Sequence, residues 1–191
     1  FNNKHLEPLA GEAVGEDGVY LLVRTCQSKI HAAQAARTQA FVDGKLRAGA
    51  RRIVDEPDYV GQELSIELRQ GETLVLEKVA SFFTSRDQAI SECGLAARKG
   101  IASAGRFDAL MADHVLTWKH LWRRFDVHIQ PAEQGFKLNV PMLLRLNIFH
   151  LLQAVSHNSI GLDIGVPGRG WTGEAYQGHI LWDELFIFPF L

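Results

Sequence analysis

The sequence predicts an α+β chain in two parts, with strands first and helices after them. Up to about residue 85, polar and apolar residues alternate in several runs, which is the period of a β-sheet with one face in water. After Ser85 the apolar residues recur every three to four positions, as they do along one face of an α-helix. Because strands and helices do not alternate, we expect separate layers or domains rather than a parallel α/β sheet.

Several runs in the first part indicate strands. Gly18 to Thr25 is apolar and rich in β-branched residues, and Gln62 to Arg69 alternates polar with apolar residues. A Gly-Glu turn follows, which predicts a hairpin between Gln62 to Arg69 and Thr73 to Thr84. Ile30 to Phe41 is ambiguous from its residues alone, because its alanines favour a helix and its position between strand-like runs favours a strand.

Three helices are predicted beyond the strands. Asp87 to Ala102 carries alanine and leucine at helical spacing, with Ser85 or Asp87 as its N-cap. Phe107 to Phe125 places its large apolar residues on one stripe, so we expect its two tryptophans to be core side chains rather than sugar platforms. Asn139 to Val155 tolerates a proline in its first turn, where the missing N–H would have no helical partner anyway.

The composition is that of an ordinary globular protein. The chain has 191 residues, 47% of them hydrophobic, which suffices for one or two domains with a core. Its 20 basic and 22 acidic residues leave a net charge of −2, so electrostatics do not support binding to nucleic acid or to an acidic membrane. No signal peptide and no run of roughly twenty apolar residues is visible in these residues.

The ends and the cysteines give further expectations. The chain begins at Phe1 without a methionine and stops at Leu191 within an apolar run, so we expect both ends to be cut points in a longer protein. Cys26 and Cys93 lack the spacing of a metal or redox motif. They are expected to be small apolar fillers in a reducing, cytoplasmic compartment, and a disulfide is the alternative.

The histidines of the second part do not predict a metal site. They lack the i, i+4 pairing and the acidic partners that a metal site needs. These residues are His114, His120, His128 and His150.

The segment from Gly178 to Glu184 (GHILWDE) carries the most informative side chains. Asp183 follows Trp182 directly, and His179 lies three residues before the tryptophan. A Trp ring packs on the C–H face of a sugar, and a carboxylate accepts hydrogen bonds from two sugar hydroxyls. An alternative is that this segment begins a helix, with Trp182 as a core side chain and the acidic residues favoured by the helix dipole. In that case His179 would lie at the helix start and bond to a backbone carbonyl.

A glycine-rich loop precedes this segment, with glycines at 161, 165, 168, 170 and 173. Glycines let the backbone pass close to a ligand or to a neighbouring helix. Arg169 between two glycines suggests a phosphate loop, but the Lys-Ser/Thr pair and the preceding strand of such a loop are missing. We therefore expect Arg169 to brace the loop through Asp163 or Glu174, at the rim of the pocket.

The run from Asp163 to Glu184 resembles a signature segment of the glycoside hydrolase family that contains maltose, kojibiose, nigerose and trehalose phosphorylases. The resemblance continues upstream through Leu144 to Gln153 and the helix with Trp118 and Trp122. It covers most of the chain and is strongest from about residue 105 onward. One departure is Leu181, where the family usually has Phe.

The resemblance implies a more detailed fold. It implies an N-terminal antiparallel β-sandwich, then linker helices, then the first helices of an (α/α)6 barrel, and it makes Ile30 to Phe41 a strand. We accordingly expect residues 1–85 to be the end of the β-sandwich, residues 86–130 a helical linker, and residues 131–191 the start of the catalytic barrel.

The resemblance also implies a function. In this family a Trp-Asp pair binds the glucosyl unit, and the general acid lies in a later Gly-Pro-Asp-Glu-like motif that is missing here. We therefore predict Trp182, Asp183, His179 and Arg169 as substrate-binding residues and expect the general acid beyond Leu191. The implied reaction is inverting phosphorolysis of an α-linked glucose disaccharide such as maltose, trehalose or kojibiose.

Such a reaction uses inorganic phosphate as a co-substrate and releases β-glucose 1-phosphate, with no cofactor and no metal. The resemblance also suggests a homodimer.

Two alternative functions stay open at this point. One is a hydrolase on the same scaffold, such as a trehalase or a maltose hydrolase, and the other is a non-catalytic sugar-binding fragment.

Overall fold

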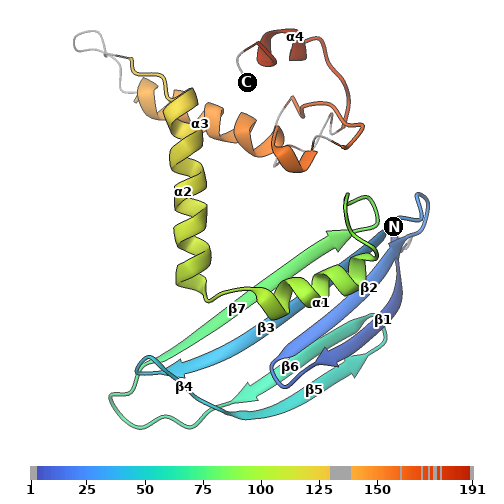
Figure 1. Cartoon of the computed structure of the whole chain (residues 1–191), viewed down its shortest axis with the longest axis vertical. Helices are drawn as coiled ribbons and strands as arrows, with labels where there is room; N and C mark the ends of the chain where they lie inside the picture. Colours follow the sequence, from blue (N-terminus) through green and yellow to red (C-terminus); the bar gives the residue numbers. More distant parts are fainter. Residues whose placement is uncertain are drawn as a thin grey trace. The chain divides into compact units, whose positions relative to one another are not determined.

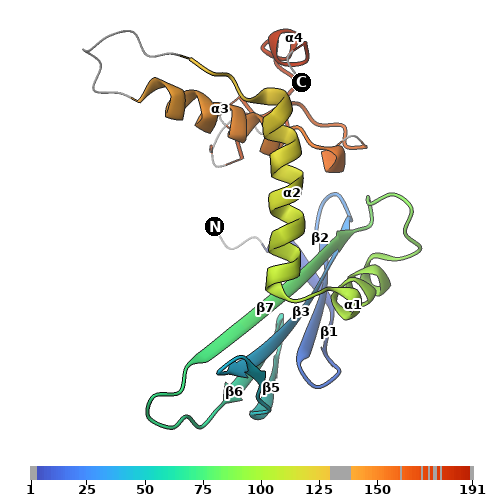
Figure 2. The ribbon, with the colours of Figure 1, turned by 60° about the vertical axis from the view of Figure 1, so that its left-hand side comes forward.

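The computed structural model describes residues 4–129, 139–159, 161–168, 170–171, 173, 176 and 178–189. The chain divides into two compact units, Phe1–Ala112 and Asp113–Leu191, which are described separately below. Figures 1 and 2 show antiparallel strands in the first unit and helices in the second. The predicted fold class, with antiparallel strands followed by helices, is therefore confirmed.

The first unit is built on an antiparallel sheet in which β3 is central. β2 pairs with β1 on one side and with β3 on the other, and β7 and the short β4 also pair with β3. A separate hairpin is formed by β5 and β6. The strands are β1 (Leu6–Val14), β2 (Gly18–Thr25), β3 (His31–Val42), β4 (Lys45–Leu46), β5 (Ala50–Glu56), β6 (Tyr59–Ser65) and β7 (Leu74–Thr84).

The predicted hairpin between the last two of these strands is wrong. Gln62 in β6 pairs with Ile53 in β5, whereas β7 pairs with β3, for example Leu76 with Ala40. Because β6 ends at Ser65 rather than at residue 69, residues 66–73 form a long connection that carries the chain from one sheet to the other. The alternating pattern predicted where β6 and β7 lie. Each of them, however, pairs with another strand, β6 with β5 and β7 with β3. The strand assignment of Ile30 to Phe41 is confirmed by β3.

Helix α1 (Cys93–Ser103) covers one face of the sheet (Figure 1) and closes the core of the first unit. The core combines small side chains, which let the helix approach closely, with a few large ones. Its buried members are Tyr20, Ala33, Ala35, Cys93, Ala97 and Ile101. Cys93 is therefore the small apolar filler that the sequence predicts, and burial raises the pKa of its thiol.

The N-cap of α1 differs from the prediction. The backbone N–H groups of Gly94 and Leu95 donate to the carboxylate of Glu92, at 2.6 Å each, and these bonds lower the pKa of Glu92. Asp87 instead accepts a hydrogen bond from the N–H of Thr84 at 2.8 Å, at the end of β7. The helix starts later than predicted because Glu92 can satisfy two of its unpaired N–H groups.

The β5–β6 hairpin lies against the opposite face of the sheet. Gly11 in β1 is so close to β6 that an added Cβ would touch Val60 at 3.6 Å. Arg51 in β5 donates to the carbonyl of Thr38 in β3 at 2.6 Å, and to Gln62 in β6 at 3.0 Å. The first unit thus resembles a sandwich of the main sheet and a small hairpin.

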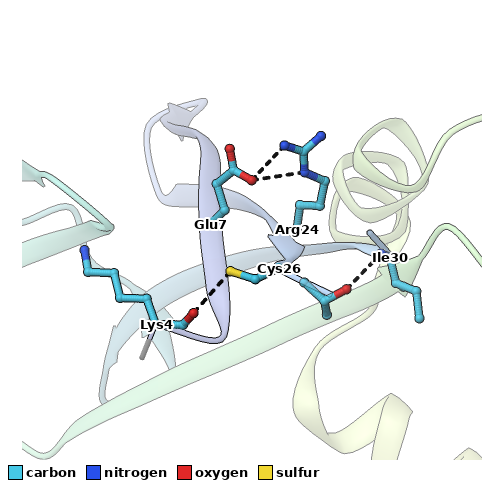
Figure 3. Close-up of polar contacts among 6 residues, drawn as sticks. Lys4, Glu7, Arg24, Cys26 and Ile30 are labelled. Carbon is cyan, nitrogen blue, oxygen red and sulfur yellow. Dashed lines mark hydrogen bonds and ion pairs between the residues drawn. The ribbon is translucent and has the colours of Figure 1, made fainter. Parts of the chain in front are cut away.

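The edge of the sheet at β1 is fixed by polar contacts (Figure 3). Arg24 donates to Glu7 across β1 and β2 at 2.7 Å, and the Cys26 thiol donates to the carbonyl of Lys4 at 3.2 Å. In the following turn the N–H of Ile30 donates to the side chain of Thr25. Cys26 is half-buried, and both cysteines are free thiols, so the alternative of a disulfide between them does not apply.

The second unit is held together by α3 (Val140–Ala154) and the part of α2 (Phe107–Phe125) that belongs to it. Phe125, Ile148 and Leu152 form its small core, with Trp118 and Trp122 half-buried against it. α2 has the predicted limits, and α3 begins and ends one residue inside its predicted range. Asn139 caps α3 by accepting from the N–H of Met142 at 3.1 Å, and Pro141 lies in the first turn as expected.

An ion pair connects the end of α2 to α3. Arg145 donates to both carboxylate oxygens of Asp126, from Nε at 2.9 Å and from Nη2 at 2.6 Å. This two-point contact lowers the pKa of Asp126. Across the residues that the structure describes, no helix is long and apolar enough to cross a membrane.

Candidate functional site

The segment after α3 folds back on itself through tight backbone contacts. The N–H of Gly170 donates to the carbonyl of Pro167 at 2.9 Å, and the N–H of Gly165 donates to the carbonyl of Gly178 at 3.3 Å. Gly170 and Gly178 have φ angles of 68° and 76°, a backbone region that glycine adopts without strain. The loop of residues 161–168 therefore lies beside the segment that begins at Gly178.

Gly165 shows why this loop needs glycine. A Cβ at this position would overlap the backbone carbonyl of His179 and would lie 2.6 Å from Oε1 of Glu184. The sequence predicts that the glycines let the backbone pass close to a ligand or a helix. At Gly165 the close neighbours are the backbone carbonyl of His179 and the side chain of Glu184, which begins a short helix.

Trp182 and Asp183 lie side by side at the start of α4 (Glu184–Ile187), and both are exposed. Trp182 is 71% exposed, and its ring meets that of Phe186 edge to face at 5.8 Å. Asp183 stands at the N-cap position, but its side chain makes no capping hydrogen bond. Within this chain Trp182 is therefore not a buried core side chain, and no capping hydrogen bond occupies the Asp183 carboxylate.

His179 is exposed and precedes α4 by several residues, so the alternative of a helix-start histidine does not apply. Its ring lies 6.3 Å from that of Tyr176, at an interplanar angle of 84°. Trp182, Asp183 and His179 thus share one short exposed stretch of backbone. Arg169 and Glu174 lie outside the described residues.

Two residues near this stretch were not predicted from the sequence. Tyr176 has a φ of 62°, which is uncommon for a bulky residue and is often found where function imposes strain. Glu184 is buried, with 9% of its surface exposed, and accepts a hydrogen bond from the N–H of Val166 at 2.8 Å. Neither feature has a sequence signal, because both depend on where the loop returns.

A cavity of about 350 Å³ lies between α3 and the loop. Asn147 and His150 contribute polar side chains from α3, and Val166, Pro167 and Gly168 form the opposite wall. Such a volume is at the lower end of the range for small-molecule sites. The loop held by Glu184 is therefore also a wall of this cavity.

The tryptophans of α2 lie in a different environment from Trp182. The Trp118 ring packs on Phe149 at 4.8 Å, beside the core of the second unit, as predicted for a core side chain. A cleft of about 360 Å³ lies beside both rings. In the described part of the chain, no group of three or more His, Cys, Asp or Glu side chains is placed to hold a metal ion.

The chain matches two domains of one known family. Residues 1–121 match the N-terminal domain of glycosyl hydrolase family 65, and residues 145–191 match the central catalytic domain of the same family. These matches agree with the observed order of antiparallel strands followed by helices.

Individual relatives share this similarity over most of the chain. It is 36% identical, over its whole length, to an uncharacterized glycosyl hydrolase of Mycobacterium tuberculosis, of which it covers 14%. It is 28% identical to kojibiose phosphorylase of Caldanaerobacter subterraneus over its whole length, covering 25% of that protein. Over 89% of the chain it is 29% identical to trehalose 6-phosphate phosphorylase of Lactococcus lactis, covering 21% of that enzyme.

The chain therefore spans between about a seventh and a quarter of the length of these relatives. The family match includes more than half of its residues and reaches into the catalytic domain. The chain belongs to glycosyl hydrolase family 65, with residues from its N-terminal domain and from its central catalytic domain.

Proposed function

We propose that this chain is the part of an inverting glycoside phosphorylase that binds the glucosyl unit of an α-linked glucose disaccharide of the maltose, trehalose or kojibiose type. The relatives named as phosphorylases of kojibiose and of trehalose 6-phosphate support this class of substrate. The observation that carries the proposal is the exposure of Trp182 next to an uncommitted Asp183 carboxylate in the catalytic-domain segment.

In this proposal each of these side chains has a separate role. The Trp182 ring contacts the apolar C–H face of the glucosyl ring, and Asp183 accepts hydrogen bonds from its hydroxyls. His179 donates a hydrogen bond to a further sugar oxygen. Arg169 is assigned to the rim of the pocket from its place in the sequence alone.

The proposed reaction breaks the bond between the anomeric carbon and the glycosidic oxygen. An oxygen of inorganic phosphate attacks the anomeric carbon from the opposite face, and a general acid protonates the departing oxygen. The configuration inverts, so an α-glucoside yields β-glucose 1-phosphate and the free acceptor. Phosphate replaces an activated water, so no carboxylate base is required.

The chain itself supplies substrate contacts rather than the proton. We assign no catalytic residue within it and place the general acid beyond Leu191, so the chain alone is expected to be inactive. Tighter hydroxyl contacts to Asp183 as the glucosyl ring flattens would contribute to transition-state binding. No cofactor, a cytoplasmic location and a homodimer remain predictions of the same proposal, as do the domain limits 1–85, 86–130 and 131–191.

A hydrolase on the same scaffold is the second candidate. This alternative rests on the relative with 36% identity, which is named an uncharacterized glycosyl hydrolase rather than a phosphorylase. A hydrolase would use water as its nucleophile and would need a second carboxylate as general base, at a distance that leaves room for the water. Trp182 and Asp183 would have the same binding role in both enzymes.

The test uses the full-length protein that contains this chain, assayed on α-linked glucose disaccharides with and without phosphate. We expect phosphate-dependent cleavage, with the β anomer of glucose 1-phosphate identified by NMR. Changing Asp183→Ala should lower kcat/KM at least about 100-fold, which is roughly 3 kcal/mol of transition-state binding. Asp113→Asn, an exposed carboxylate on α2, is the control.

The outcomes separate the candidates. Cleavage at the same rate without phosphate would identify a hydrolase. An unchanged kcat/KM in Asp183→Ala would remove this residue from the substrate site, and with it the observation that supports the proposal.

A further inference from the structure

Glu184 is turned in the opposite direction from its neighbours in α4. It is 9% exposed, whereas Leu185 and Phe186 are 75% and 72% exposed. It is the single buried charged side chain among the described residues. Burying a carboxylate is costly unless it accepts hydrogen bonds, so its position indicates a specific partner.

That partner is the loop before the segment. Oε1 of Glu184 accepts from the N–H of Val166 at 2.8 Å, and the same oxygen is next to Gly165. The N–H of Gly165 donates in turn to the carbonyl of Gly178. Two adjacent residues of the loop are therefore fixed to both ends of the stretch that carries His179, Trp182 and Asp183.

Another side of the loop lines the cavity next to α3. Val166 and Pro167 are buried, and together with Gly168 they form the cavity wall that faces Asn147 and His150 of α3. Glu184 thus joins to α4 a loop that also lines the cavity next to α3. Its carboxylate does this as a hydrogen-bond acceptor for a backbone N–H group.

We infer that Glu184 is a positioning residue, which holds Trp182 and Asp183 in the orientation that binds the glucosyl unit by fastening the Gly165–Val166 backbone to α4. This inference rests on the proposed function of Trp182 and Asp183. Glu184 itself touches no substrate and transfers no proton. Loss of its hydrogen bond lets the loop and α4 separate, so the two substrate contacts lose their alignment.

The experiment compares Glu184→Ala with Glu184→Gln in the full-length protein. Glutamine keeps a carbonyl oxygen that can accept from the N–H of Val166, whereas alanine has none. We expect Glu184→Ala to raise the KM for the disaccharide about 10-fold or more. The KM for phosphate should stay within about twofold, because the phosphate site is expected beyond Leu191, and Glu184→Gln should stay within about threefold of the parent enzyme for both.

Two results would overturn the inference. A lower melting temperature with an unchanged disaccharide KM in Glu184→Ala would show a purely structural role. An equal rise of KM in Glu184→Gln and Glu184→Ala would show that the negative charge, rather than the acceptor, is what matters.

Gly165→Ala gives a second test that leaves Glu184 intact. The added methyl group collides with the His179 carbonyl, so the same selective rise in disaccharide KM is expected. If Glu184→Ala does not fold, an unchanged KM in Gly165→Ala overturns the inference.

Asp183→Asn is measured in parallel to separate the two proposals. If Asp183→Asn raises the disaccharide KM and the Glu184 and Gly165 variants do not, the positioning role alone is wrong. If Asp183→Asn has no effect, the proposed function of this segment and the inference built on it both fail.

Discussion

The first unit and the segment of residues 178–189 differ in how they accommodate large apolar side chains. In the first unit Ile101 is 4% exposed, enclosed between α1 and the sheet, whereas Ile180 is 72% exposed. Several more apolar side chains of the segment are exposed in the same way, namely Trp182, Leu185, Phe186 and Phe188. The first unit thus has a closed core beside exposed apolar side chains such as Phe82, whereas no apolar side chain of the segment is buried.

The difference teaches that large apolar side chains serve two separate purposes in this chain. A sheet with a helix on one face and a hairpin on the other encloses its apolar side chains within a short distance. A contiguous exposed apolar surface is instead typical of a place where a ligand or another part of a protein binds. The one inward residue of α4, Glu184, is charged, which reverses the usual pattern of apolar inside and polar outside.

The largest predicted effect on stability compares two isoleucines, the buried Ile101 and the exposed Ile180. Ile101→Ala should lower the free energy of unfolding by about 2–5 kcal/mol, because it leaves a cavity in the core between α1 and the sheet. Ile180→Ala should change it by less than about 0.5 kcal/mol, because its side chain is already in water. Urea unfolding of the chain followed by circular dichroism measures both, and equal losses would contradict the contrast.

A second comparison concerns the tryptophans. Trp118 packs on Phe149 and on the core of the second unit, so Trp118→Ala should cost about 2 kcal/mol, less than a fully buried tryptophan. Trp182→Ala should change stability by less than about 0.5 kcal/mol. In the full-length protein, Trp182→Ala should raise the disaccharide KM, while folded Trp118→Ala should keep the parental KM. The reverse result would mean that the assignments of core and pocket are exchanged.

The smallest predicted effect concerns the start of α1. Glu92→Ala should lower the free energy of unfolding by about 1 kcal/mol, because the N–H groups of Gly94 and Leu95 lose their acceptor. Asp87→Ala, at the N-cap position predicted from the sequence, should have a smaller effect on α1. A larger loss in Asp87→Ala would contradict the observed cap.

The same cap predicts a pH dependence. The folded-state pKa of Glu92 is lowered, so its stabilising contribution is present above the unfolded value, about 4.3, and is lost as pH falls through the folded value. Glu92→Gln keeps a neutral acceptor and should remove this part of the pH dependence. The urea midpoints of the parent chain and of Glu92→Gln, measured at several acidic pH values, test this. If both midpoints fall equally as pH is lowered, the role of the Glu92 charge is contradicted.

The sequence by itself determined the type and limits of elements with a clear local period. Gly18–Thr25 and Phe107–Phe125 have the predicted bounds, and α3 begins and ends within a residue of its prediction. These successes have a common cause, because alternation and helical spacing are properties of consecutive residues. The sequence also singled out the segment around Trp182 and Asp183, whose motif resembles one family, and its role in binding a sugar stays a prediction.

Only the tertiary structure decided which distant parts of the chain meet. It pairs β6 with β5 instead of β7 and caps α1 with Glu92. It also turns Glu184 inward onto Val166 while Trp182 stays exposed. The physical reason is that strand partners, caps and buried charges are selected by hydrogen bonds and packing between residues that are far apart in the sequence, and no local period records those contacts.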